Sequence, residues 1–184
     1  MCSIPNVRTN TTTAYLGLGS NLGDRAGNLL AAVRCLIEAD FEVHCVSGVY
    51  ETEPIDIDTE LDFLNMVAEI RVRDVRPTQM MARLLRIEYV LGRRDKVEKR
   101  PRTIDLDLLF FGKEVLQTDF LTLPHPRLHQ RKFVLVPLAE VAPQFVHPVM
   151  HKEMRQLLDE CDDISYVERW NPNGAHHESL ILNS

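Results

Sequence analysis

The chain has 184 residues, of which 45% are hydrophobic and 26% are charged, a composition typical of one globular domain. Its formal net charge of −6 argues against a nucleic-acid partner, because nucleic-acid-binding proteins usually present a basic surface. No apolar run approaches the ~20 residues that span a bilayer, and residues 1–13 lack the apolar stretch of a secretory signal. We expect one domain over 1–184, with a core at about 13–168, flexible polar tails at 1–12 and 170–184, and no membrane partner.

The cysteines are irregularly spaced and form no Cys-x-x-Cys pair. The four are Cys2, Cys35, Cys45 and Cys161. A disulfide framework or a zinc site is therefore not expected. Free thiols favour a reducing, cytoplasmic location.

The first predicted elements are a strand and a helix. Residues 13–18 alternate, which places Ala14, Leu16 and Leu18 on one face of a short strand. The glycine-rich segment 19–23 ends this strand, and apolar residues at helical spacing follow it. The predicted apolar stripe of the helix consists of Leu29, Leu30, Val33, Leu36 and Ile37.

Two more strands follow, separated by an acidic loop. Residues 43–52 are rich in β-forming side chains, whereas 54–62 have no apolar period. Residues 63–72 alternate cleanly, with one wholly apolar face. That face carries Leu64, Met66, Ala68, Ile70 and Val72. The opposite face, with Phe63 and Asn65, is mixed and is therefore free to line a site.

A second helix and a fourth strand complete the predicted core. Pro77 suits the first turn of the helix and Gly92 suits the position after its end. Its predicted stripe consists of Met80, Met81, Leu84, Ile87, Val90 and Leu91. Residues 104–111 read as a strand, and Gly112-Lys113 predicts a tight hairpin turn into 114–116.

The order strand, helix, strand, strand, helix, strand predicts an α+β fold of the ferredoxin-like βαββαβ type, with two helices on one face of an antiparallel sheet. The hairpin and short C-terminal helices within 126–161 would be additions to this sandwich.

Two carboxylates form the sharpest chemical feature of the sequence. Asp105 and Asp107 are two residues apart on a predicted strand, so they share a face with Cα atoms about 6.5–7 Å apart. Such neighbours repel each other unless a cation lies between them, and Mg²⁺ commonly bridges carboxylates to phosphates. The alternative is an exposed strand face bonded to arginines. The basic cluster just before them favours metal and phosphate, although such a cluster could also be a solvated loop. It consists of Arg93, Arg94, Lys96, Lys99, Arg100 and Arg102.

A stiffened histidine follows the carboxylates. His125 lies between Pro124 and Pro126, which restrict the backbone around it. With the cations that follow, it suits a triphosphate clamp; the alternative is an ordinary surface or core histidine. The nearby cations are Arg127, Arg131 and Lys132.

The glycine-rich segment 17–23 joins the first strand to the first helix. Such turns can bind phosphate through backbone N–H groups. It is not a P-loop, because no Lys-Ser/Thr follows it. It could equally be the tight turn that lets the helix pack.

Taken together, these motifs resemble the 6-hydroxymethyl-7,8-dihydropterin pyrophosphokinase family. They occur in the family's order over about residues 13–165. The motifs include Gly-Ser-Asn-Leu at 19–22, Tyr50-x-Thr52-x-Pro54, Phe63-Leu64-Asn65, Arg86-Ile87-Glu88, Pro101-Arg102-x-x-Asp105-x-Asp107, Leu123-Pro124-His125 and Arg131-x-Phe133. The Pro-Arg-x-x-Asp-x-Asp element is the most specific of them.

The resemblance implies transfer of pyrophosphate from ATP to the pterin hydroxymethyl group, giving AMP and the pterin diphosphate for folate synthesis. It implies two Mg²⁺ ions held by Asp105 and Asp107. The catalytic residues would be Arg93, Arg102, Asp105, Asp107, His125 and Arg131. The ATP site would be formed by Glu88, Arg93, Arg102, Thr122, His125 and Arg131. The pterin site would be formed by Thr52, Phe63, Asn65 and Phe133. We expect a monomer.

Two rival interpretations differ in class. A ferredoxin-like nucleic-acid-binding module conflicts with the acidic net charge. A non-catalytic nucleotide-binding paralogue is suggested by departures from the family pattern, above all Arg100, where relatives usually carry a glycine before Pro101.

Overall fold

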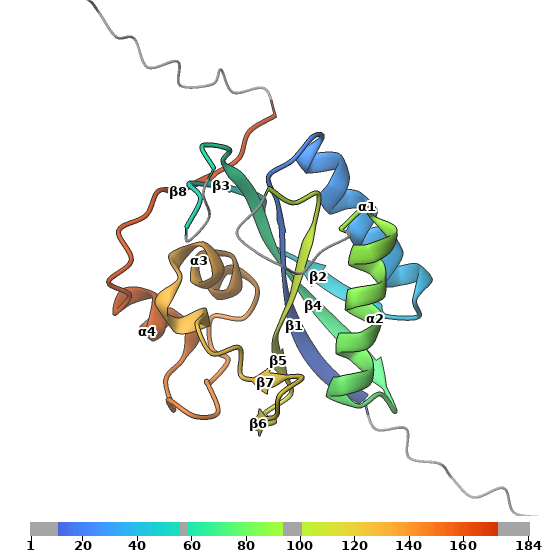
Figure 1. Cartoon of the computed structure of the whole chain (residues 1–184). Coiled ribbons are helices and arrows are strands. Elements are labelled where there is room, and N and C mark those ends of the chain that lie inside the picture. Colours follow the sequence, from blue (N-terminus) through green and yellow to red (C-terminus); the bar gives the residue numbers. More distant parts are fainter. Residues whose placement is uncertain (1–10, 56–58, 94–100, 173–184) are drawn as a thin grey trace, which may run out of the picture.

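A computed structural model gives the fold. It describes residues 11–55, 59–93 and 101–172. Figure 1 shows three layers: α1 (Arg25–Glu38) and α2 (Pro77–Val90) cover one face of a central sheet, and α3 (Lys132–Val141) and α4 (Met154–Asp159) lie over the other. Within the described ranges, no helix is both long and apolar enough to cross a membrane.

The sheet is antiparallel throughout. Its strands are β1 (Thr11–Ser20), β2 (Glu42–Val46), β3 (Tyr50–Thr52), β4 (Phe63–Arg73), β5 (Asp105–Phe111) and β8 (Val167–Arg169). Their order is β5-β1-β4-β3-β8, and β2 pairs with β4 along the edge that β3 also uses. The ferredoxin-like α+β fold predicted from the sequence is confirmed. The single strand predicted over 43–52 is divided in two at residues 47–49.

Strand β1 is longer than the predicted 13–18 and includes Gly19, which was expected to end it. Gly19 pairs with Asn65 on β4 and with Asp105 on β5. Gly17 pairs in the same way with Val67 and Asp107. Because directly paired residues share a face of the sheet, the register brings the mixed face of β4 beside the two carboxylates of β5.

The main hydrophobic core lies between the sheet and α1 with α2. The alternating residues predicted for β1 and β4 are buried there. On α1, Leu29, Ala32 and Leu36 face this core, whereas Leu30 and Ile37 are 72% and 57% exposed. The predicted stripe was therefore too wide. Leu30 follows Leu29 by 100° around the helix, which turns it toward solvent.

The second helix begins and ends as predicted. Pro77 occupies its first turn, and Gly92 adopts a φ of 99° directly after the C-cap. The buried apolar residues at its centre are Met80, Leu84 and Ile87. Val90 was placed in the apolar stripe but is 67% exposed.

The predicted hairpin is displaced along the chain. Gly112 does make a turn, with a φ of 55°, but the strand after it does not return along β5. Instead β6 (Leu116–Gln117) pairs with β7 (Thr122–Leu123). The Thr118 hydroxyl donates to the Leu121 carbonyl and accepts from the Leu121 amide, at 2.9 and 3.0 Å, and so closes the actual turn.

A second core lies on the other face of the sheet. Tyr15, Val67, Leu109 and Phe110 pack there against apolar residues from α3 and α4. Those helical residues include Val134, Leu135, Leu138, Met154 and Leu157. The helices cover only part of this face, and the remainder forms the site described next.

Candidate active site

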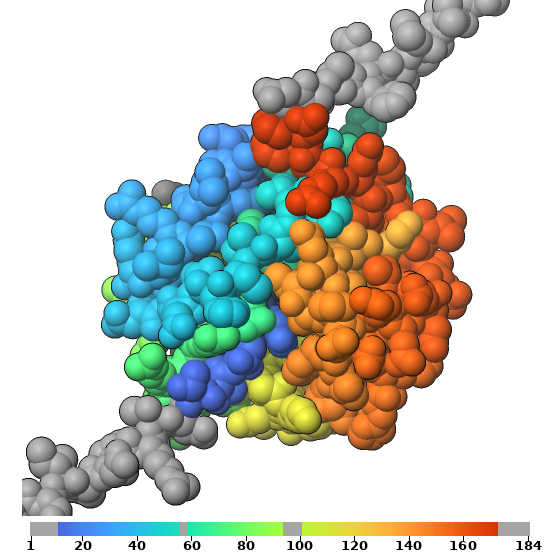
Figure 2. All heavy atoms as spheres, turned by 180° about the vertical axis from the view of Figure 1, so that it is seen from behind, coloured from blue at the N-terminus to red at the C-terminus, as the bar shows by residue number. Residues whose placement is uncertain are grey.

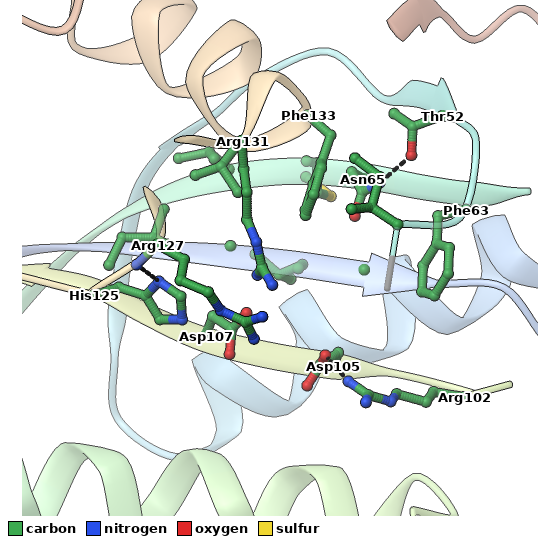
Figure 3. Close-up of a pocket in the computed structure, with 18 of the residues that line it drawn as sticks. Thr52, Phe63, Asn65, Arg102, Asp105, Asp107, His125, Arg127, Arg131 and Phe133 are labelled. Carbon is green, nitrogen blue, oxygen red and sulfur yellow. Dashed lines mark hydrogen bonds and ion pairs between the residues drawn. The ribbon is translucent and has the colours of Figure 1, made fainter. Parts of the chain in front are cut away.

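A cavity of about 280 Å³ opens on the α3 side of the sheet. Its floor is formed by β1, β4 and β5, and its walls by β3, the start of α3 and the segment around His125 (Figure 3). The predicted site residues that line it are Thr52, Phe63, Asn65, Arg93, Arg102, Asp105, Asp107, His125, Arg131 and Phe133. Glu88 and Thr122 do not line it.

A glycine on β1 makes room for the polar side chain at the floor. A Cβ atom on Gly19 would lie 2.7 Å from Oδ1 of Asn65. At Gly17, a Cβ atom would meet Leu109 and Asp107 only at ordinary contact distances. The structure thus gives Gly19 a steric role within a strand. The available sequence signal was its position two residues after Gly17, which places both glycines on one face of β1.

The carboxylate of Asp105 is held by two arginines. Arg93 Nη1 pairs with its Oδ1 atom, and Arg102 Nη1 pairs with its Oδ2 atom. Burial alone would raise the pKa of Asp105, but the two guanidinium groups outweigh burial and hold that pKa below its usual value. Asp105 therefore stays ionised.

Asp107 projects from the same face of β5 into the cavity (Figure 3). Burial and then the negative charge of Asp105 raise its pKa to about 6, while the charge of Arg131 acts in the opposite direction. A carboxylate whose ionisation is opposed in this way gains from a cation bound beside it. The pair is thus suited to a hard metal ion.

Glu88 lies behind the cavity and belongs to the same charge network. Its Oε1 atom accepts a hydrogen bond from the Leu106 amide at 2.8 Å and pairs with Arg93. The residue is 3% exposed, and burial raises its pKa to about 7. Glu88 therefore pairs with Arg93 from outside the cavity, at the junction of α2 and β5.

His125 is fixed by its backbone and by its ring. Its amide donates to the Leu109 carbonyl at 2.9 Å, and its Nδ1 atom accepts from the Arg127 amide at 3.3 Å. Burial, followed by the charges of Arg131 and Arg127, lowers the pKa of His125 to about 4. The ring is thus neutral near pH 7 and carries its proton on Nε2. Arg127 also lines the cavity, although sequence reasoning named it only as a neighbour of His125.

The other end of the cavity combines an amide with aromatic rings. Asn65 Nδ2 donates to Oγ1 of Thr52 at 2.8 Å, and both residues are buried. In Figure 3, Phe133 from α3 and Phe63 from β4 lie on either side of Asn65. Phe63 belongs to neither hydrophobic core although it is only 9% exposed. The Arg131 guanidinium lies 5.5 Å from the centre of the Phe133 ring.

The cavity therefore has two chemically different ends. One end offers aromatic faces and a buried amide, which suit a flat heterocycle with a hydrogen-bonding edge. The other end offers guanidinium groups, a histidine N–H and two carboxylates, which suit a polyphosphate with a divalent cation.

Comparison with known proteins agrees with this geometry. Residues 15–143 match the model of the 7,8-dihydro-6-hydroxymethylpterin-pyrophosphokinase family. The chain belongs to this family. The resemblance inferred from the sequence motifs is thus confirmed.

Curated pyrophosphokinases are similar over most of the chain. The 2-amino-4-hydroxy-6-hydroxymethyldihydropteridine pyrophosphokinase of Bacillus subtilis is 44% identical over 132 residues, covering 71% of this chain and 78% of that protein. The protein of the same name from Aquifex aeolicus is 35% identical over 148 residues, covering 80% of this chain and 91% of the relative.

Solved structures of the family share the fold. A Plasmodium falciparum HPPK-DHPS structure matches with a TM-score of 0.67 at 16% identity. The match covers 84% of this chain but only 46% of that one, so the chain spans less than half of the longer protein.

Proposed function

We propose that this pyrophosphokinase transfers the pyrophosphoryl group of ATP to the hydroxymethyl oxygen of 6-hydroxymethyl-7,8-dihydropterin. The products are AMP and the pterin diphosphate, a step in folate biosynthesis. Family membership supports this reaction. The observation that carries the proposal is that one cavity joins Asn65 and its flanking rings to the carboxylate pair and the arginines. The comparisons lend no support to a non-catalytic role.

The pterin occupies the aromatic end in this proposal. Phe63 and Phe133 contact the two faces of the ring system, and Asn65 reads its hydrogen-bonding edge. The bond from Asn65 Nδ2 to Thr52 Oγ1 supports this role, because it fixes the direction of the amide. With its N–H₂ group engaged, the amide oxygen is available to accept from the pterin.

The triphosphate occupies the basic end. Arg93, Arg102, His125 and Arg131 contact its oxygens, and the position of Arg127 in the same cavity supports a further cationic contact. Arg93 and Arg102 exchange Asp105 for phosphate oxygens when the nucleotide binds. Glu88 acts through Arg93 because it does not line the cavity. Thr122, on β7, lies near the nucleotide.

The carboxylate pair fits Mg²⁺. Asp105 and Asp107 share one face of β5 and would hold Mg²⁺ through their hard carboxylate oxygens. Among the residues that the structure describes, no group of three or more His, Cys, Asp or Glu could hold a metal ion. Two Mg²⁺ ions held by these carboxylates would neutralise charge on the phosphates.

The chain's own residues act by positioning and by charge. The Phe63–Asn65–Phe133 end holds the hydroxymethyl oxygen toward the β-phosphorus. A bond forms between this oxygen and the β-phosphorus, the bond from the β-phosphorus to the α,β-bridging oxygen breaks so that this oxygen leaves on AMP, and the hydroxyl proton passes to water. The arginines stabilise the charge on the transferred group. Neutral His125 donates a hydrogen bond from Nε2 to a phosphate oxygen. Phosphoryl transfer of this kind depends mainly on alignment, and no strong base is needed.

Incubation with ATP, Mg²⁺ and the pterin alcohol, followed by chromatography of the nucleotides, tests the reaction. AMP should appear in proportion to the pterin consumed. ADP as the sole nucleotide product, or no turnover, would overturn the proposal.

We also infer a monomeric, single-domain enzyme of the cytoplasm. The free thiols of Cys35, Cys45 and Cys161 support a reducing compartment. Light scattering of the purified chain tests its oligomeric state, and a mass of twice the 21.1 kDa protomer would contradict a monomer.

A further inference from the structure

The first turn of α3 carries pocket residues, and its own helix closes it through the Arg131 carbonyl, which accepts the Val134 and Leu135 amides at 3.1 and 3.0 Å. Arg131 is the N-cap, and its side chain makes no capping hydrogen bond. Phe133 lies in the first turn, and Pro137 lies one turn later, inside the helix. Because proline has no N–H, the Phe133 carbonyl lacks its usual helical hydrogen bond. The turn that presents Phe133 to the cavity therefore gains from further support.

That support comes from Asp163, 31 residues away in the sequence. Its Oδ2 atom accepts the Lys132 amide at 2.8 Å, and its Oδ1 atom accepts the Ser165 amide at 2.9 Å. Burial would raise the pKa of Asp163, but the polar groups of Ser165, the Lys132 amide and the charge of Lys132 outweigh burial and hold that pKa below its usual value. An ionised carboxylate at the N-terminus of a helix both satisfies a free N–H group and interacts favourably with the helix dipole.

The segment around Asp163, residues 160–170, is here called the C-terminal strap. Its β8 part pairs with β3, with Val167 opposite Thr52, and the Trp170 amide donates to the Val49 carbonyl at 2.8 Å. Figure 2 shows its red residues lying against the cyan residues of β3. The strap therefore contacts two walls of the cavity, although it lies beyond the 15–143 segment that matches the family model.

We propose that Asp163 is a positioning residue for the pterin end of the cavity. It caps α3 from the strap, and it thereby holds Phe133 at the distance from Asn65 that a pterin ring requires. This inference rests on the proposed function, because it assigns a residue to the pterin site of that reaction. Asp163 does not itself line the cavity.

The expected loss of pterin affinity follows from the fraction of molecules in which the first turn of α3 is ordered. Loss of a helix cap costs about 1 kcal/mol, which would reduce the population of an ordered first turn up to about fivefold. The apparent dissociation constant of a ligand rises by the factor by which its binding-competent state is depleted. Asp163→Ala should therefore raise the dissociation constant of the pterin by at most about fivefold, and by less the more fully the turn is ordered in the wild type. ATP binding should change less than about twofold, because Arg131 is one of several cations at that end.

Three variants distinguish the positioning of Phe133 by Asp163 from a general loss of order in the protein. Asp163→Ala removes both acceptors, and Asp163→Asn keeps one acceptor oxygen and should give an intermediate effect. Asp162→Ala is the matched control, because it removes an adjacent, exposed carboxylate. If Asp163→Ala fails to fold, Asp163→Asn carries the test. Calorimetry measures pterin and ATP affinity for each folded variant, and steady-state kinetics should show a raised KM for the pterin with kcat largely kept.

Amide hydrogen exchange on the free protein gives a readout that does not depend on the reaction. Exchange at residues 132–135 should become faster in Asp163→Ala and stay at the wild-type rate in Asp162→Ala. Unchanged exchange and unchanged pterin affinity in folded Asp163→Ala would overturn the inference, as would equal losses for pterin and ATP. A wild-type chain that binds no pterin would instead overturn the proposed function, and exchange would still decide whether Asp163 holds the turn.

Discussion

Arg93, just after α2, forms an ion pair with Asp105, the first residue of β5. Arg102 pairs with the second oxygen of the same carboxylate. The charge of a proposed metal ligand is therefore already balanced in the ligand-free chain. In the proposed function, binding of nucleotide with metal would exchange these partners together, because freeing Asp105 for a cation also frees two arginines for phosphate.

The two carboxylates should be equally necessary for turnover but different in stability. Asp105→Ala and Asp107→Ala should each reduce activity at least about 100-fold, through lost charge neutralisation at the phosphates. Asp105→Ala should also lower the free energy of unfolding by about 1–3 kcal/mol, because it leaves the partly buried Arg93 with one carboxylate fewer. Asp107→Ala should raise it by up to about 1 kcal/mol at pH 7, since burial and Asp105 oppose ionisation of Asp107.

Urea denaturation with a chelator present measures the stabilities of these two variants. Near-normal turnover by either at ordinary Mg²⁺ concentrations would contradict the assignment of the metal site.

Phe63→Ala should weaken pterin binding selectively. The ring belongs to neither core, so its loss should cost little stability. Stacking on a flat ring contributes about 0.5–1.5 kcal/mol beyond area burial, so affinity should fall roughly tenfold. Calorimetry should find ATP binding almost unchanged. Equal losses for both ligands would show that Phe63 supports the whole cavity rather than the pterin.

Thr52→Val should weaken pterin binding through Asn65. The substitution keeps the shape of the side chain but removes the oxygen that accepts from Asn65 Nδ2. The amide group is then unsatisfied and free to turn, at a cost of about 1–3 kcal/mol shared between stability and pterin affinity. The measurements are a denaturation curve and a pterin titration. Wild-type values in both would show that Thr52 does not orient the amide.

A pH-dependent stability should arise at His147, which does not line the cavity. Its ring is buried against Phe110, and its Nδ1 atom accepts the Val149 and Met150 amides at 3.2 and 3.1 Å. Burial, followed by the charges of His129 and His151, lowers the pKa of His147 to about 4.

A histidine with a lowered pKa contributes stability above its unfolded pKa of about 6.5, and loses that contribution as the pH falls toward the folded value. His147→Asn offers an oxygen in place of Nδ1 but does not titrate. Between pH 7 and 4 the wild type should therefore lose about 1–3 kcal/mol more than this variant. Denaturation at several pH values compares the two slopes, and parallel curves would refute the prediction.

The sequence predicts best those features that depend on the alternation of side chains between the two faces of a strand. The apolar face of β4, its mixed face with Phe63 and Asn65, and the shared face of Asp105 and Asp107 all follow from the two-residue period of a strand. The turn at Gly92 follows from the preference of glycine for positive φ. These local rules predicted the fold class and which side chains share a face.

What the sequence does not predict depends on long-range packing. Nothing local shows that α3 and α4 lie over the mixed face of the sheet, or that Asp163 caps a helix 31 residues earlier. The exposure of Leu30 depends on which side of α1 meets the sheet. The basic positions within 94–100 lie outside the described residues, so the interpretation of that loop stays a prediction.

Phosphorus NMR of the complete reaction tests the central claim most directly. With ATP, Mg²⁺ and the pterin alcohol, the spectrum should show the single signal of AMP and two coupled signals of a diphosphate attached to the pterin. Asp107→Ala should leave the ATP signals in place. A pterin carrying one phosphorus, formed together with ADP, would contradict pyrophosphoryl transfer as the activity of this chain.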